Sequence, residues 1–139
     1  MAGLLTHLGI SLLGFIIICF IFYKTKLKNK IIYGLGFAFG NLAPDLIDFG
    51  VLSIKTGSLN PDKIMTNPLF HTLALLGHTF SNWLILAVII MSISWFLYEL
   101  KKISKKTFVM IIILIILILI GVITHLKFDA MIIETNHWI

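Results

Sequence analysis

Imidazole and carboxylate side chains interrupt the most apolar parts of this sequence. The chain of 139 residues has five histidines and six acidic residues. Most of them lie inside or beside apolar segments, namely His7, Asp45, Asp48, His71, His78, His125 and Asp129. Ionisable groups are costly in such places and mark functional sites. Their nitrogen and oxygen atoms are the ligands that Zn²⁺ and similar ions take, so they are candidates for a metal site.

Local spacing favours convergence of these side chains. His125 and Asp129 are four residues apart and share one helix face. His71 and His78 are seven apart and also share a face if their helix is continuous. Neighbouring carboxylates repel one another in a low dielectric, whereas divalent ions would neutralise them and could leave a position for water.

A structural interpretation stands beside the metal site. A single histidine near a membrane surface more often bonds to a neighbouring helix. An aspartate after a helix-ending proline, such as Asp45 after Pro44, is often a turn residue. The joint pattern favours a metal site over a structural polar cluster. The sequence has no G-x-S-x-G, H-E-x-x-H, Walker or dinucleotide-binding motif.

Composition places these residues in an integral membrane protein. The chain is 59% hydrophobic and 12% charged, with a mean hydropathy of +1.05. A soluble domain needs more polar surface. Residues 4–23 and 108–123 are nearly unbroken apolar runs, and about 20 such residues cross a bilayer. We therefore expect one all-α domain over residues 1–139, a polytopic membrane helical bundle.

Hydropathy predicts four membrane passes, at residues 4–23, 31–43, 68–100 and 107–126. We expect Pro44 to break the second helix near Asp45 and a polar loop to run from about residue 49 to 66. The third pass would be ~50 Å long as one helix and must begin outside the membrane, tilt or break. Gly77 is the expected hinge.

Lysines predict the orientation in the membrane. The net charge of +5 comes without any arginine, and eight of the eleven lysines lie in residues 24–30 and 101–106. If all four segments cross, both clusters lie on one side, which the positive-inside rule makes cytoplasmic. The candidate site and both termini would then face the extracytoplasmic side of the cell (plasma or inner) membrane. The expected partners are membrane lipids and no nucleic acid.

Four blocks of the sequence resemble the YdjM-like family of membrane-bound, predicted metal-dependent hydrolases. They are Thr6-His7, the G-x-x-x-P-D-x-x-D block from Gly40 to Asp48, the pair His71 and His78, and the G-x-x-x-H-x-x-x-D block from Gly121 to Asp129. Their order is also distantly similar to that of zinc-dependent phospholipase C enzymes. The family's middle block often pairs its first histidine with arginine, whereas Thr72 follows His71 here.

The resemblance implies roles for these residues. It assigns a metal-ligand core to His7, Asp45, His71, His125 and Asp129. Asp48 and His78 become catalytic groups, as further ligands or partners of ligands, and Asp48 or Asp129 is the candidate general base. The cofactor would be one or two divalent ions, with Zn²⁺ the first candidate.

Together these observations predict a membrane-embedded metal-dependent hydrolase that acts on a lipid or other interfacial ester or phosphoester through a metal-activated water. The alternative is a non-enzymatic membrane protein in which the His/Asp cluster is structural. A metal or proton conduit is disfavoured because the other half of each span lacks polar steps.

Overall fold

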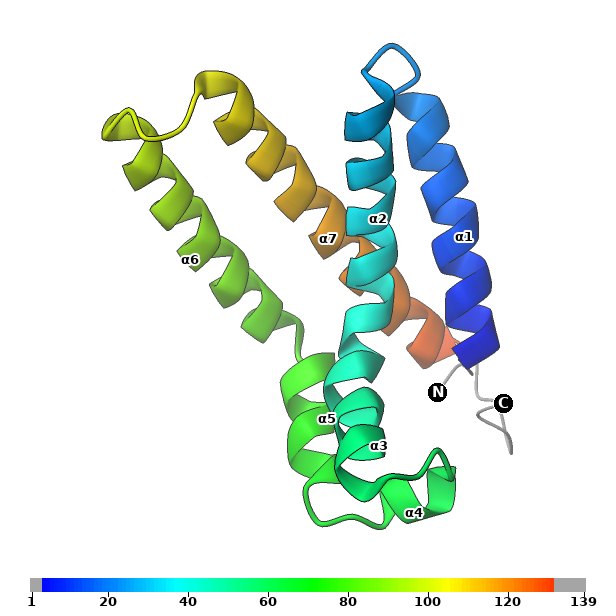
Figure 1. The fold of residues 1–139 in the computed structure, drawn as a ribbon. Coiled ribbons are helices and arrows are strands. Elements are labelled where there is room, and N and C mark those ends of the chain that lie inside the picture. Colours follow the sequence, from blue (N-terminus) through cyan, green and yellow to red (C-terminus); the bar gives the residue numbers. More distant parts are fainter. Residues whose placement is uncertain (1–3, 132–139) are drawn as a thin grey trace.

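The computed structural model describes residues 4–131, and these form helices joined by short links (Figure 1). The all-α prediction is confirmed for this range. The elements are α1 (Leu4–Ile21), α2 (Leu27–Asp45), the π-helical turn η1 (Leu46–Gly50), α3 (Val51–Thr56), α4 (Pro61–Met65), α5 (Phe70–His78), α6 (Phe80–Glu99) and α7 (Lys105–Met131).

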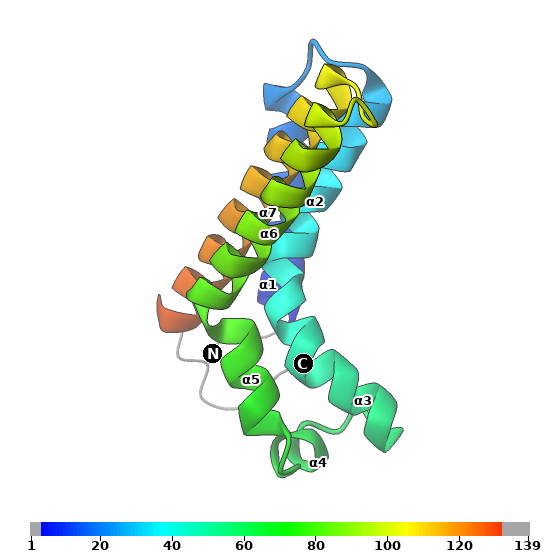
Figure 2. The same cartoon turned by 90° about the vertical axis from the view of Figure 1, so that its left-hand side faces the viewer.

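Two helical hairpins form the long part of the molecule. One consists of α1 and α2, the other of α6 and α7, and α7 crosses α2 (Figures 1 and 2). The two hairpin loops, which carry the lysine clusters, lie at the same end in both views. The short helices α3, α4 and α5 lie at the opposite end, beyond the start of α1 and the end of α7.

Three helical segments are long and apolar enough to cross a membrane. They are Leu27–Thr56, Phe80–Glu99 and Lys105–Met131, with 30, 20 and 27 residues. The helix α1 is also apolar, but its apolar stretch, Leu5–Ile21, is shorter than these three. Many large apolar side chains on these helices are exposed, as lipid-facing residues are. The structure thus agrees with an integral membrane protein and gives three of the four predicted spans.

The regular α-helix α2 ends at Asp45, next to Pro44, as predicted, but the apolar helical segment does not end there. The helical path continues from α2 through η1 and α3 to Thr56 and ends at Gly57, whose φ of 61° is left-handed. Proline removes one backbone hydrogen bond and crowds the preceding turn. A wider π-helical turn follows directly, and the helix continues through it. The predicted loop of residues 49–66 accordingly contains α3 and α4.

The third predicted pass is broken, as expected, close to Gly77. The break itself is at Thr79, whose backbone is extended between α5 and α6. Two side chains of α6 replace the lost backbone bonds: Trp83 Nε1 donates to the Gly77 carbonyl at 2.6 Å and Asn82 Nδ2 to the Leu76 carbonyl at 3.0 Å. The break lets α5 take a direction different from that of α6.

Glycines set the distances between the helices that carry the polar residues. A Cβ atom on Gly40 would overlap the Ile118 carbonyl, and one on Gly121 would lie 2.7 Å from the Asn41 nitrogen. A Cβ atom on Gly77 would lie 2.8 Å from the Pro44 carbonyl oxygen. The backbones of α2, α5 and α7 therefore approach one another closely around residues 40–45.

Candidate metal centre

Four side chains from three helices converge where α2, α5 and α7 meet. Asp45 comes from the end of α2, His78 from the end of α5, and His125 and Asp129 from the last turns of α7. Each offers one nitrogen or oxygen atom, and all four atoms lie within 4.8 Å of one another. Imidazole nitrogens and carboxylate oxygens are the donors that divalent transition metals take in proteins.

Three of the donor atoms have the mutual distances of ligands around a small tetrahedral ion, and the fourth lies slightly further out. The Nε2 atoms of His78 and His125 are 3.2 Å apart, and they lie 3.2 and 3.3 Å from Asp129 Oδ2. Asp45 Oδ1 lies 3.5 Å from His125 Nε2 and 3.7 Å from His78 Nε2. Ligands at 2.0–2.1 Å from a tetrahedral Zn²⁺ are separated by about 3.3–3.4 Å. The donor atoms of His78, His125 and Asp129 therefore have the spacing that such an ion requires.

Hydrogen bonds leave both histidines able to bind a cation. His125 Nδ1 donates to the Asn41 backbone carbonyl at 2.8 Å, and His78 Nδ1 donates to the Ala74 carbonyl at 3.2 Å. In a neutral ring the remaining Nε2 is then an acceptor. Two acceptors 3.2 Å apart cannot bond to each other, so a proton or a metal ion must lie between them.

Two of the four converging side chains are buried, and the buried Asp45 carboxylate requires a compensating positive charge. His125 is fully buried and Asp45 is 5% exposed, and neither oxygen of the Asp45 carboxylate has a hydrogen-bond partner in the protein. An unpaired buried carboxylate is costly, and a metal ion compensates for that cost. The side chains of His78 and Asp129 are 16% and 10% exposed, so an ion or water molecule would enter the group past these two residues.

His78, which lies just before the spanning helix α6, has an altered proton affinity. Burial disfavours its charged form, but the hydrogen bond to Asp129 and the charges of Asp48 and Asp45 outweigh burial and raise the pKa of the imidazole. A proton and a divalent ion compete for the same Nε2 lone pair. The carboxylates that favour the proton would favour the metal ion as well.

His7 lies behind this group and orients one of its members. Its Nε2 is 3.1 Å from Asp129 Oδ1, the oxygen other than the one that His78 and His125 approach. Its ring stacks on His125 with 4.0 Å between centroids. Asn41 Nδ2 donates to the His7 carbonyl and to Ser11 Oγ, both at 2.9 Å, which ties α1 to α2. His7 thus contacts a donor residue but is not one of the four converging groups.

Asp48 lies on the other side of His78. Its Oδ2 is 3.5 Å from His78 Nδ1, and its Oδ1 accepts a hydrogen bond from the Phe49 backbone N–H. Asp48 therefore orients His78, in the way carboxylates support metal-binding histidines. Burial raises the cost of its charge, because the side chain is fully buried within the turn η1.

The structure does not bring His71 to the site. His71 is exposed on α5 and precedes His78 by seven residues, about 10 Å along the helix. His78, which the sequence resemblance gave a catalytic role, lies among the converging donor groups, where His71 was expected. Asn41 was missed by sequence reasoning, although a lone amide in an apolar helix was a usable sign.

The assembled site is a compact set of two imidazoles and two carboxylates, supported by His7, Asn41 and Asp48. It joins helices that are far apart in the sequence, and it can hold one small divalent cation. Comparisons with protein-family models, curated proteins and solved structures found no match for this chain.

Proposed function

We propose that this protein is a membrane-embedded metal-dependent hydrolase whose ion is held by His78, His125 and Asp129, with Asp45 beside it. The observation that carries the proposal is the convergence of four donor atoms within 4.8 Å, with both Nε2 atoms turned inward. The near-tetrahedral spacing and the mixed nitrogen and oxygen donors favour Zn²⁺. We assign one ion to this set.

The proposed chemistry follows from the position of Asp45, which lies further from the two histidine nitrogens than these nitrogens and the Asp129 oxygen lie from one another. His78, His125 and Asp129 are separated by 3.2–3.3 Å, whereas Asp45 is 3.5 and 3.7 Å from the two histidines. Three protein ligands and a water are typical of catalytic zinc sites, and the ion lowers the pKa of that water to about 7. Asp45, with no protein donor on either oxygen, would accept the proton as general base.

The location of the site favours an interfacial substrate. Asp129 lies near the end of the spanning segment Lys105–Met131, and His78 lies just before the segment Phe80–Glu99. The exposed parts of the site therefore lie at the level where lipid esters and phosphoesters meet water. The resemblance of the sequence to YdjM-like predicted hydrolases supports the same reaction class.

A structural metal centre is the second candidate, and the number of donors favours it. Four protein ligands close the coordination sphere in structural zinc sites. If Asp45 binds the ion directly, the centre would fasten α2, α5 and α7 together without an open position. The protein would then be a non-enzymatic membrane protein stabilised by its metal.

Metal analysis of the purified full chain tests both candidates. We expect about one ion per chain in the wild type and in His71→Ala, whose exposed imidazole is a matched control. His125→Ala should lose the ion, because it removes a donor and its bond to Asn41. A wild type that binds no ion after incubation with Zn²⁺, or a His125→Ala variant that keeps it, would contradict the proposed centre.

Asp45→Asn separates the enzyme from the structural centre. If Asp45 is the general base, Asp45→Asn should retain the ion and lose hydrolysis of a phospholipid or p-nitrophenyl ester. If Asp45 is a fourth ligand, the same substitution should lower both the metal content and the melting temperature. Hydrolysis that survives both Asp45→Asn and a chelator would exclude the proposed mechanism.

A further inference from the structure

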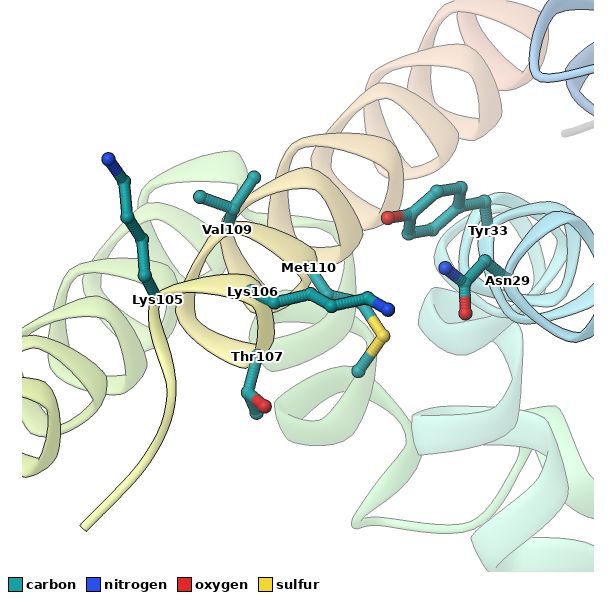
Figure 3. A pocket seen from close by; sticks show the side chains of 7 residues that line it. All are labelled: Asn29, Tyr33, Lys105, Lys106, Thr107, Val109 and Met110. Atoms are coloured by element: carbon teal, nitrogen blue, oxygen red, sulfur yellow. The ribbon is translucent and has the colours of Figure 1, made fainter. Parts of the chain in front are cut away.

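A pocket of about 550 Å³ lies at the lysine-rich end of the bundle, far from the metal centre (Figure 3). Asn29 and Tyr33 line it from the first turns of α2, and Lys106, Val109 and Met110 line it from the first turns of α7. In Figure 3 the Lys106 amine, the Asn29 amide and the Tyr33 hydroxyl point into the space between the two helices, whereas Lys105 points away.

The charge at this end has almost no internal compensation. Eight lysines lie in residues 24–30 and 101–106. Among the described residues, Glu99 is the acidic group nearest to these loops along the chain, and it lines a different depression together with Lys101 and Lys102. The lining of the pocket with Lys106 contains no carboxylate. Of the two lysines that line it, Lys106 points inward and Lys105 away, and one inward ammonium beside the Asn29 amide and the Tyr33 hydroxyl suits a singly charged phosphate diester.

The walls of the pocket change from polar to apolar along the helices. Met110 packs against the buried cluster of Ile18, Tyr33, Phe37 and Leu117. Val109 is 44% exposed and Ile116, two turns further along α7, is 49% exposed. A ligand with a phosphate at the lysine level and hydrocarbon chains along α7 would match both parts. Free inorganic phosphate would use only the polar part.

We propose that this pocket binds the headgroup of an anionic phospholipid, with Lys106, Asn29 and Tyr33 contacting the phosphate and the acyl chains lying against α7. Basic pockets between membrane helices on the cytoplasmic side hold anionic lipid headgroups in this way. The proposal is independent of the metal centre, because it concerns the opposite end of the molecule and needs no ion.

Native mass spectrometry of the full chain, released from nanodiscs of equal phosphatidylglycerol and phosphatidylcholine, tests the proposal. We expect the wild type to retain phosphatidylglycerol preferentially. Lys106→Gln should reduce that retention about fivefold, the effect of about one lysine near an anionic surface. Lys102→Gln is the matched control, because it removes the same charge at the same end but lines the other depression. It should retain lipid like the wild type.

Tyr33→Phe and Asn29→Leu test the pocket without changing any charge. Each removes one hydrogen-bonding group and should weaken phosphatidylglycerol retention while phosphatidylcholine is unaffected. Equal losses in Lys106→Gln and Lys102→Gln, or no preference for phosphatidylglycerol in the wild type, would overturn the proposal. Displacement of the lipid by millimolar inorganic phosphate would also overturn it, since the site would then be one for a soluble anion.

Discussion

Asp129 uses its two carboxylate oxygens in different ways. Oδ2 faces the Nε2 atoms of His78 and His125, while Oδ1 lies 3.1 Å from His7 Nε2. A carboxylate held on one side by a histidine has one preferred orientation, so its other oxygen points at the metal position without further ordering. His7 is fully buried, stacks on His125 and is therefore a positioning residue for two donors.

His7→Ala should weaken metal binding without abolishing it. Loss of an outer partner of a metal ligand typically costs 10–100-fold in affinity, and we expect that range in a competitive chelator titration. At saturating Zn²⁺ the variant should still bind one ion per chain. His7→Gln, whose amide can donate to Asp129, should recover part of the affinity. If His7→Ala binds no ion even at saturation, His7 is itself a ligand, as the sequence resemblance implied.

The helices explain why the sequence predicted part of the site and missed the rest. Hydropathy and the lysine clusters predict the long helices and the common end of their polar residues. The pairing of His125 with Asp129 could be predicted because both residues lie on one face of a single helix. The choice between His71 and His78 depends on which end of α5 contacts α2. Gly77 makes that contact at Pro44, which brings in His78 and leaves His71 exposed.

Pro44 shows a second limit of local rules. The rule that proline ends a helix ignores the packing of the following turn, where Asp45 and Asp48 are both buried. The chain continues as a π-helical turn and places these two carboxylates on either side of His78. The contact between His7 and Asp129 joins residues 122 positions apart. Such a contact depends on how α1 packs against the other helices, which spacing alone does not give.

The crossing of α2 and α7 predicts strong effects of small substitutions. Gly40→Ala puts a methyl group on the Ile118 carbonyl, and we expect it to lower the free energy of unfolding by about 1–3 kcal/mol. Metal affinity should fall as well, because Asp45 and His125 would move apart. Gly9→Ala is the control, since its Cβ would meet no atom within 4 Å. Unfolding in detergent mixtures measures both. Equal stability of the two variants would show that α2 and α7 do not pack closely here.

The whole molecule separates its charges along its length. Lysine-rich loops lie at one end of the long helices, and the His/Asp group lies near the other, beside α3, α4 and α5 (Figure 1). By the positive-inside rule, such an arrangement predicts that the lysine-rich end lies on the cytoplasmic side. We propose that α1 also crosses, which makes four passes and places the metal centre on the extracytoplasmic side. The N-terminal residues, whose predicted location depends on α1, lie outside the described range.

Cysteine labelling tests this orientation in a Cys19→Ala background, which removes the one native thiol. Thr25→Cys lies in the loop between α1 and α2, and Leu59→Cys lies between α3 and α4, where the native side chain is 77% exposed. In sealed cells an impermeant maleimide should label Leu59→Cys and spare Thr25→Cys, and permeabilisation should expose both.

Ala2→Cys should behave like Leu59→Cys, because a crossing α1 puts the N-terminus on the side of the metal centre. Labelling of Thr25→Cys alone would invert the topology and place the metal centre in the cytoplasm. Labelling of Leu59→Cys without Ala2→Cys would mean that α1 does not cross, which leaves three passes and puts the N-terminus on the side of the lysine-rich loops.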